Sequence, residues 1–319
     1  MLRRTRVACV WWSRPGVCAL ALAGAAWFAG PASAQSASGF YLSQEVGLNL
    51  APRVELLGNS DDRASRCDEF INPRYAEVPG CTDPNRGSGA GWRTAFDRAA
   101  GVVAGLAAGY QFGGRLRVEA EWFHRESGYD RTAPVTSATG DTLGKLGGEI
   151  QRADNRLGSI SSHNVFANVY VDFPSRSRLT PYVGFGGGVG LTELDYGDLW
   201  ARNPDPAAIG TAAGLPNEAE IRQNLAATTS SKQGELDDRL TAYQVLGGVD
   251  YAMSDAVSLG VKVRWVRFGR FLAEGIEWER LRSHPSQLRL DGSEPVTFRI
   301  RTAGALSFVG VSLAMRYAF

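Results

Sequence analysis

Apolar and polar side chains alternate along most of this chain with a period of two. In residues 303–319, every second side chain from Val309 to Phe319 is apolar, whereas those between them are mostly small or polar. Such alternation is typical of a β-strand that has one apolar face. The chain therefore ends in a predicted strand, and its last residue is aromatic.

The same alternation recurs seven times earlier in the chain. It predicts strands at about 39–51, 99–112, 116–123, 164–173, 179–194, 240–253 and 257–266. Short connections separate three pairs of these strands: 113–114, 174–178 and 254–256. The other connections are long and aperiodic: 52–98, 127–162, 195–239 and 269–302. Within the third of these, residues 216–225 predict a short helix, because Pro216 near a helix start is followed by good helix formers.

Short and long connections follow one another in strict alternation, which places all short ones at one end of the strands. Outer-membrane barrels have this asymmetry, with short periplasmic turns, long extracellular loops and an even number of strands. The prediction is an all-β fold: an eight-stranded antiparallel up-and-down transmembrane β-barrel with four long extracellular loops and three short periplasmic turns.

Aromatic residues on the apolar faces are predicted to lie at two heights, as in the girdles that mark the two membrane interfaces. Those near the short-turn end are Phe40, Tyr110, Phe112, Phe173, Tyr251, Tyr317 and Phe319. Those near the long-loop end are Trp122, Tyr243 and Trp265.

The first 34 residues have the composition of a secretory signal peptide. Four arginines precede an apolar run at 17–30, and Ala34 closes an A-x-A sequence. That run is too short to span a membrane as a helix. We therefore expect a signal peptide at 1–34, a barrel domain at 35–319, and export to the cell outer membrane.

Removal of the predicted signal changes the charge and the cysteine count. Residues 35–319 keep 30 basic and 33 acidic side chains, a net charge of about −3, which excludes the basic footprint of a nucleic-acid-binding protein. Of the four cysteines, Cys67 and Cys81 remain, and a pair of cysteines in an exported protein predicts one disulfide.

Several segments resemble a known family. They are 168–174, 180–184, 242–248 and 116–121. These segments look like the opacity-type proteins and related eight-stranded outer-membrane surface antigens of Gram-negative bacteria, over roughly half of residues 35–319. The end of the chain, with Tyr317 and Phe319, likewise resembles the C-terminal strand that the barrel-assembly machinery reads. The resemblance implies action through the loops, as adhesins, antigens or contacts to the envelope, and no shared catalytic residues.

The faces predicted to point into the barrel carry nine charged residues: Glu45, Arg117, Glu119, Glu121, Asp172, Asp250, Lys262, Arg264 and Arg316. Eight strands leave room for side chains but not for an aqueous channel. Buried charges are tolerable when they are paired. We therefore interpret these residues as a structural network of ion pairs, with a small-solute channel as the alternative.

Signals for catalysis or cofactors are weak. His124, Glu126 and Ser127 lie together at the predicted outer rim, but their spacing departs from the motif of outer-membrane lipid A deacylases. His163 and His284 have no metal-ligand spacing. The glycine-rich stretch 184–190 lacks the third glycine of a dinucleotide-binding loop, and small residues facing a crowded lumen explain it better.

The sequence thus predicts a non-enzymatic outer-membrane surface protein without cofactor that displays loops for adhesion or envelope interaction. A porin-like channel is the alternative, and a lipid-modifying hydrolase is a weaker one. The expected partners are outer-membrane lipid and lipopolysaccharide, the barrel-assembly machinery, and a host or matrix ligand that binds the loops, with the protein itself a monomer.

Overall fold

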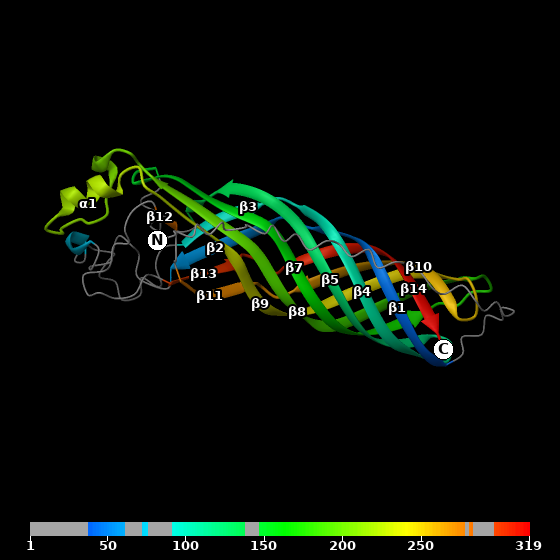
Figure 1. Cartoon of the computed structure of the whole chain (residues 1–319). Helices are drawn as coiled ribbons and strands as arrows, with labels where there is room; N and C mark the ends of the chain where they lie inside the picture. Colours follow the sequence, from blue (N-terminus) through cyan, green and yellow to red (C-terminus); the bar gives the residue numbers. More distant parts are fainter. Residues whose placement is uncertain (1–37, 61–71, 76–90, 138–146, 278–280, 283–296) are drawn as a thin grey trace, which may run out of the picture.

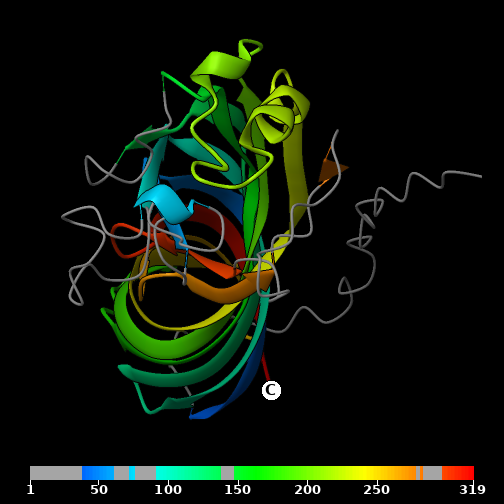
Figure 2. The same ribbon diagram turned by 90° about the vertical axis from the view of Figure 1, so that its left-hand side faces the viewer.

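Eight strands pair edge to edge and close into a ring (Figures 1 and 2). The computed structural model describes residues 38–60, 72–75, 91–137, 147–277, 281–282 and 297–319. The ring strands are β1 (Gly39–Ala51), β4 (Ala99–Phe112), β5 (Leu116–Pro134), β7 (Ile150–Asp172), β8 (Leu179–Arg202), β9 (Thr229–Ala252), β10 (Val257–Phe268) and β14 (Ser307–Ala318). Each pairs antiparallel with its chain neighbours, and β14 pairs with both β10 and β1 to close the ring. The predicted eight-stranded antiparallel barrel is confirmed.

The short connections all lie at the end of the molecule that holds the C-terminus (Figure 1). The predicted bounds of β1 and β4 agree with the structure, since their alternation is regular from end to end. The turn between β4 and β5 contains Gly114, whose φ of 91° lies in the left-handed region that glycine tolerates. Among the described residues, no helix has the length and apolar character of a membrane span.

Two predicted loops are wrong in their extent. Much of 127–162 and 195–239 is strand, because β5, β7, β8 and β9 run well past their predicted ends to lengths of 19, 23, 24 and 24 residues. The β5–β7 register shifts between Gly128 and Arg131, and the β7–β8 register shifts between Leu157 and Ile160. Each shift breaks the period of two, so the alternation disappears from the sequence while the ladder continues.

A second sheet forms within the connections predicted as aperiodic loops 52–98 and 269–302, together with the segment after β5. Its strands are, in spatial order, β11 (Leu272–Glu277), β13 (Thr297–Thr302), β2 (Val54–Ser60), β3 (Gly91–Phe96) and β6 (Thr136–Ser137). A further two-residue strand, β12 (Leu281–Arg282), pairs with β9. These strands lie near the α1 end in Figure 1. The described parts of these two loops are therefore mostly sheet.

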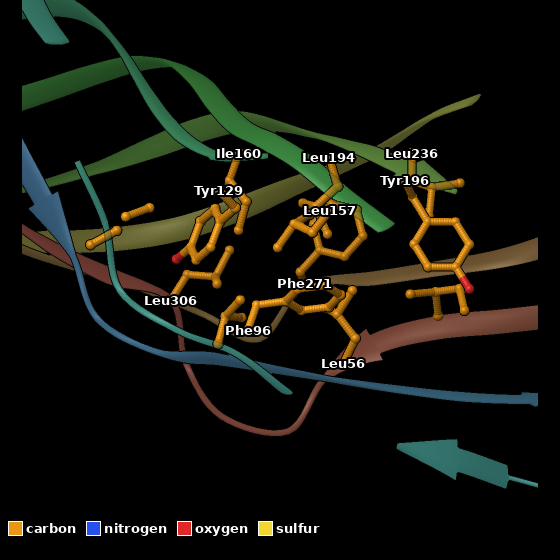
Figure 3. Packing of buried hydrophobic residues seen from close by; sticks show 14 of the residues in the cluster. Leu56, Phe96, Tyr129, Leu157, Ile160, Leu194, Tyr196, Leu236, Phe271 and Leu306 are labelled. Atoms are coloured by element: carbon orange, nitrogen blue, oxygen red, sulfur yellow. The ribbon is translucent and has the colours of Figure 1, made fainter. Parts of the chain in front are cut away.

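A hydrophobic core lies between the second sheet and the extended parts of β5, β7, β8 and β9. Leu157 and Leu194 point toward Leu56 and Phe271 (Figure 3), and all four are almost completely buried. We call this part of the molecule the upper section; it comprises 127–134, 150–161, 192–202, 229–239 and the second sheet. The remainder of the ring, toward the short turns, is the lower section.

The lower section has the opposite polarity. Its outer face carries large exposed apolar side chains, among them Leu48, Val169 and Leu313, whereas its interior is polar. Aromatic rings pack on the outer face at two heights: Phe40 with Tyr110 at 4.9 Å near the short turns, and Tyr243 with Trp265 at 5.6 Å near the upper section. An apolar belt between aromatic girdles is the surface that a transmembrane barrel presents to lipid.

The tip of the molecule lies beyond the upper section and is built from the connection between β8 and β9. It contains η2 (Pro206–Ala208) and α1 (Glu218–Leu225), which confirms the helix predicted within 216–225. Ile209, Ile221 and Leu225 form a small core of their own. The 3-10 turn η1 (Pro73–Tyr75) is attached to this tip, since Arg74 N–H donates to the Ala213 carbonyl at 3.0 Å.

Candidate functional site

The nine charged residues predicted to face the lumen all lie inside the lower section. Eight of them are less than a tenth exposed, and the Arg316 side chain is 18% exposed. They come from six strands (β1, β5, β7, β9, β10 and β14), so no local segment could assemble them. The ion pairs fall into two clusters stacked along the barrel axis.

The first cluster joins two acids and two bases near the middle of the barrel. Lys262 Nζ lies 3.2 Å from Glu45 Oε2 and 3.0 Å from Glu121 Oε1. Arg264 Nη2 lies 2.8 Å from Glu121 Oε1 and also bonds Glu45. Gln244 Nε2 donates to Glu121 Oε2 at 2.8 Å. Each charge therefore has two opposite charges in contact, as burial requires.

The second cluster lies nearer the short turns. Arg117 Nη2 is 2.8 Å from Asp172 Oδ1, and Arg117 Nη1 is 3.9 Å from Asp250 Oδ2. Arg316 Nη2 is 3.2 Å from the same Asp250 oxygen. The Arg117 guanidinium also lies over the ring of Tyr170, 4.8 Å from its centroid. Rings and charges together fill this part of the lumen.

Glu119 is held by neutral groups. Its carboxylate accepts hydrogen bonds from the hydroxyls of Tyr41 and Tyr170, at 3.1 and 2.8 Å, and from Asn168 Nδ2 at 3.3 Å. Among the described residues, no basic group lies within ion-pair distance of it. Glu119 is therefore stabilised as an acceptor without a cation in contact.

The glycines of β8 face these side chains. A Cβ added at Gly184 would lie 2.5 Å from the Tyr170 ring, and one at Gly188 would lie 2.6 Å from the Phe166 ring. The crowded lumen thus accounts for the glycine-rich stretch, as the sequence suggested.

A layer of four phenylalanines, contributed by β5, β7, β10 and β14, closes the lumen above the first cluster. Phe123 lies 5.5 Å from Phe166 and 6.2 Å from Phe308, which in turn lies 6.2 Å from Phe268. All four are buried. The polar interior is therefore separated from the upper core by packed aromatic rings.

One buried charge above this layer is not among the residues predicted to face the interior. Arg125 follows Phe123 on the same face of β5 and is 2% exposed. The signal was available, because the interior parity of Glu119, Glu121 and Phe123 continues to Arg125. The strand was predicted to end too early for this residue to be assigned to the interior.

The weak hydrolase signal separates in space. Ser127 Oγ faces the interior, where it donates to Asn49 Oδ1 at 2.6 Å, whereas His124 lies on the outer face. There the His124 ring is 4.5 Å from that of His163, and His163 stacks on Trp122 at 6.0 Å. The sheet itself lies between the serine and the histidine, so this pair does not form a nucleophile and its base.

Other predicted features are placed as follows. Within the described part of the chain, no group of three or more His, Cys, Asp or Glu side chains could hold a metal ion. Tyr317 and Phe319 pack edge to face at 5.1 Å on the outer surface beside the short turns, and their role in assembly stays a prediction. Cys67, Cys81 and the predicted signal peptide 1–34 lie outside the described residues.

No family model and no curated protein matches this chain. Among solved structures it is similar to Neisserial surface protein A, with 13% identity, a TM-score of 0.38, and coverage of 88% of this chain and 98% of that one. It is similar to the outer membrane protein OprG of Pseudomonas aeruginosa, with 12% identity, a TM-score of 0.36, and coverage of 88% and 96%. Ail, the attachment invasion locus protein of Yersinia pestis, matches with 8% identity, a TM-score of 0.24, and coverage of 84% and 98%. They are surface or outer-membrane proteins of the kind that the sequence resembles, and the fold of this chain rests on its own strand pairing.

Proposed function

We propose that this protein is an outer-membrane barrel that holds a rigid body outside the cell for contact with a partner, and that it neither conducts solutes nor catalyses a reaction. The observation that supports this best is the apolar core of the upper section, which fills the ring above the phenylalanine layer and Arg125. A packed core is as dense as an organic crystal, so it leaves no aqueous path.

The lengths of the strands support a body that projects from the bilayer. A transmembrane strand needs about 9–11 residues. At 23, 24 and 24 residues, β7, β8 and β9 are about twice that long. The apolar belt covers only their halves near the short turns, so the other halves stand in water. With short turns in the periplasm, the upper section and the tip lie outside the cell.

The tip is preorganised for contact. Glu149 is buried and accepts hydrogen bonds from the N–H groups of Gly210 and Thr211, at 2.9 and 3.0 Å, and pairs with Arg202 at 3.2 Å. Arg74 pairs with Glu218 at 2.8 Å and ties η1 to the first turn of α1. A surface that is already ordered loses less entropy when it binds. We therefore assign adhesion or envelope contact to this tip.

The base of the tip permits a clean deletion. Ala227 N–H donates to the Asn203 carbonyl at 3.0 Å, so the two residues that flank 204–226 already lie as close together as the ends of a two-residue hairpin turn. Residues 204–226 can thus be replaced by Asn-Gly, which favours such a turn, without changing the β8–β9 register. Cells that carry the wild type should bind at least one of a panel of matrix proteins, epithelial cells and immobilised lipopolysaccharide. The deletion should abolish that binding while the barrel remains folded and heat-modifiable.

A matched control alters the opposite end of the barrel. Arg176→Ala, in the exposed turn between β7 and β8, should leave binding at the wild-type level. Undiminished binding by the deletion variant would refute the assignment to the tip. Failure of wild-type cells to bind any member of the panel would refute adhesion.

The polar interior of the lower section favours a small-solute channel as the second candidate. Planar-bilayer recording separates the two proposals, because a barrel that only holds a body outside the cell should give no steady conductance. The double variant Phe123→Ala and Phe308→Ala, which truncates two rings of the phenylalanine layer, should not conduct either, because the upper core still closes the ring. Steady currents in the wild type would favour the channel.

A further inference from the structure

Arg125 differs from the other buried cations of the barrel in what surrounds it. Lys262 and Arg264 each contact two carboxylates, and so does Arg117. Arg125 Nε instead donates to Ser162 Oγ at 3.1 Å, and its Nη1 donates to Ser127 Oγ at 2.9 Å. Within the described residues, no carboxylate lies within ion-pair distance of it. Arg125 is thus a buried charge whose hydrogen-bond partners are neutral.

Aromatic rings compensate for only part of this charge. The Arg125 guanidinium carbon lies 5.1 Å from the centroid of Phe308 and 5.7 Å from that of Phe268. Such contacts offset only part of the penalty for taking an unpaired ion out of water. The site therefore favours a negative counter-charge.

Hydrogen-bond donors exceed acceptors around Arg125. A guanidinium has five N–H groups, and protein acceptors take two of them here. The Ser127 hydroxyl donates its own hydrogen bond to Asn49 Oδ1. Ser162 Oγ accepts hydrogen bonds from both Arg125 Nε and Asn164 Nδ2, so the Ser162 O–H is still free to donate.

The same layer holds one more donor and one more acceptor. Thr192 lies opposite Ser162 in the β7–β8 ladder, and its buried hydroxyl has no hydrogen-bond partner; the buried Oδ1 of Asn164 has none either. The unmet groups are thus three N–H groups of Arg125, which only donate, one carbonyl oxygen, which only accepts, and two hydroxyls, which can do either, so an excess of donors and a positive charge remain. A water molecule offers as many donors as acceptors, whereas an anion only accepts.

We propose that this polar layer binds one monovalent inorganic anion of halide size, held by Arg125 together with the hydroxyls of Ser162 and Thr192. The phenylalanine layer below and the apolar core above enclose the site and restrict it to a small ion. The anion would enter as the barrel folds, and it would neutralise Arg125, which among the buried cations of the described residues is the one without a carboxylate in contact. The site lies apart from the tip and does not depend on the proposed adhesion.

Refolding of the full barrel in detergent, from urea, tests the proposal with chloride itself. Sodium chloride is exchanged for sodium gluconate at constant ionic strength, and the melting temperature and the folded yield are measured. Both should rise with chloride and saturate. Bromide should replace chloride, and crystals grown in bromide should show one anomalous peak beside the Arg125 guanidinium.

Three variants and one control locate the effect. Arg125→Met should lose the dependence on chloride, whereas Arg131→Met, which removes an exposed arginine of the same strand, should keep it. If Arg125→Met does not fold, Thr192→Val and Ser162→Ala serve instead. Each keeps the guanidinium but removes a donor, and each should raise the chloride concentration at half effect by about tenfold, the effect of about 1.4 kcal/mol of lost binding energy.

Two results would overturn the proposal. A melting temperature that is independent of chloride, together with density beside Arg125 that has no anomalous signal, would mean an ordered water only and would overturn the proposal. A chloride effect that persists in Arg125→Met, or in both hydroxyl variants at unchanged concentration, would place the ion elsewhere and would overturn it as well.

Discussion

The upper and lower sections share four continuous strands, yet they are built inside out relative to each other. Leu48 of β1, in the lower section, is 68% exposed on the outer face, whereas Leu56 of β2, in the upper section, is 1% exposed inside. Glu121 and Arg264 occupy the interior of the lower section, where the upper section has leucine and phenylalanine. What lies outside each section explains the difference. The lower section turns apolar side chains outward because lipid surrounds it, and the upper section turns polar side chains outward because water surrounds it.

A strand of alternating apolar and polar residues does not by itself determine which of its two faces points into the barrel. Both sections use a period of two, and only the solvent decides which face turns inward. The change occurs at the phenylalanine layer, where Arg264 lies over the Phe123 ring at 4.3 Å from below and Arg125 lies against Phe308 from above. This layer therefore separates a barrel stabilised by ion pairs from one stabilised by an apolar core.

The largest effect is expected where the lower interior loses a charge. Arg264→Leu leaves Glu45 and Glu121 to share Lys262, and it should lower the free energy of unfolding by about 3–5 kcal/mol. Urea unfolding in detergent, followed by heat modifiability, measures this. Arg131→Leu is the control, because its pair with Asp97 is exposed and contributes about 0–1 kcal/mol.

A second variant makes that test specific. Arg264→Leu combined with Glu45→Leu removes an opposite charge with the arginine, and part of the stability should return. An Arg264→Leu protein that melts like the wild type and shows a shifted ion preference would instead indicate a channel lining.

Truncation of leucines should expose the reversed polarity directly. Leu56→Ala leaves a cavity in the upper core and should cost about 2–5 kcal/mol. Leu48→Ala changes only a contact with lipid or detergent and should cost much less. Unfolding of both variants in the same lipid gives the comparison. Equal losses would mean that Leu48 is packed against protein, which would contradict a lipid-facing belt.

Introduction of charge tests the outer faces. Leu313 is 69% exposed in the belt of β14, so Leu313→Arg should cost about 2–4 kcal/mol near the membrane midplane. The same kind of change at an exposed site of the upper section, Gln233→Arg, should be nearly neutral, because water surrounds it. Folding into vesicles, measured by the yield of heat-modifiable protein, should rank the two variants. Two equal yields would place both faces in the same solvent.

The smallest effect is expected from like charges on the outer face of the upper section. The pKa of the Glu193 carboxyl is raised, first by its hydrogen bond with Glu235, then by burial and by the charges of Glu235 and Asp237. A raised carboxyl pKa means that the folded state holds the proton more tightly. Stability therefore falls as pH rises from the unfolded-state pKa through the folded one, and the loss is complete above it.

Glu193→Gln should remove this loss of stability. At pH 8 the variant should exceed the wild type by about 0.2–0.5 kcal/mol, since a partly exposed cross-strand pair is screened by water. The gain should vanish below about pH 4, where the unfolded carboxyl is protonated as well. Melting curves at several pH values check this, with Glu220→Gln on the exposed face of α1 as control. A gain that does not depend on pH would assign the effect to something other than this proton.

The sequence by itself determined the ring and its contents. Regular alternation in β1, β4, β10 and β14 predicted strand positions, the spacing of connections predicted which ends meet, and the parity of residues such as Glu121 predicted an interior position. These inferences succeeded because a strand between lipid and a filled lumen alternates without interruption, so the local pattern carries the whole signal.

Tertiary structure alone decided the upper section. Register shifts near Gly128 and Leu157 erase the period of two, and β2, β3, β11 and β13 find their partners across long stretches of chain. Buried polar residues such as Asn155 and Thr94, which form a hydrogen bond of 2.9 Å with each other, make the inner face still harder to recognise from the sequence. Pairing between distant segments leaves no period in the sequence of either one, so only the folded chain shows which strands meet and which ion pairs close.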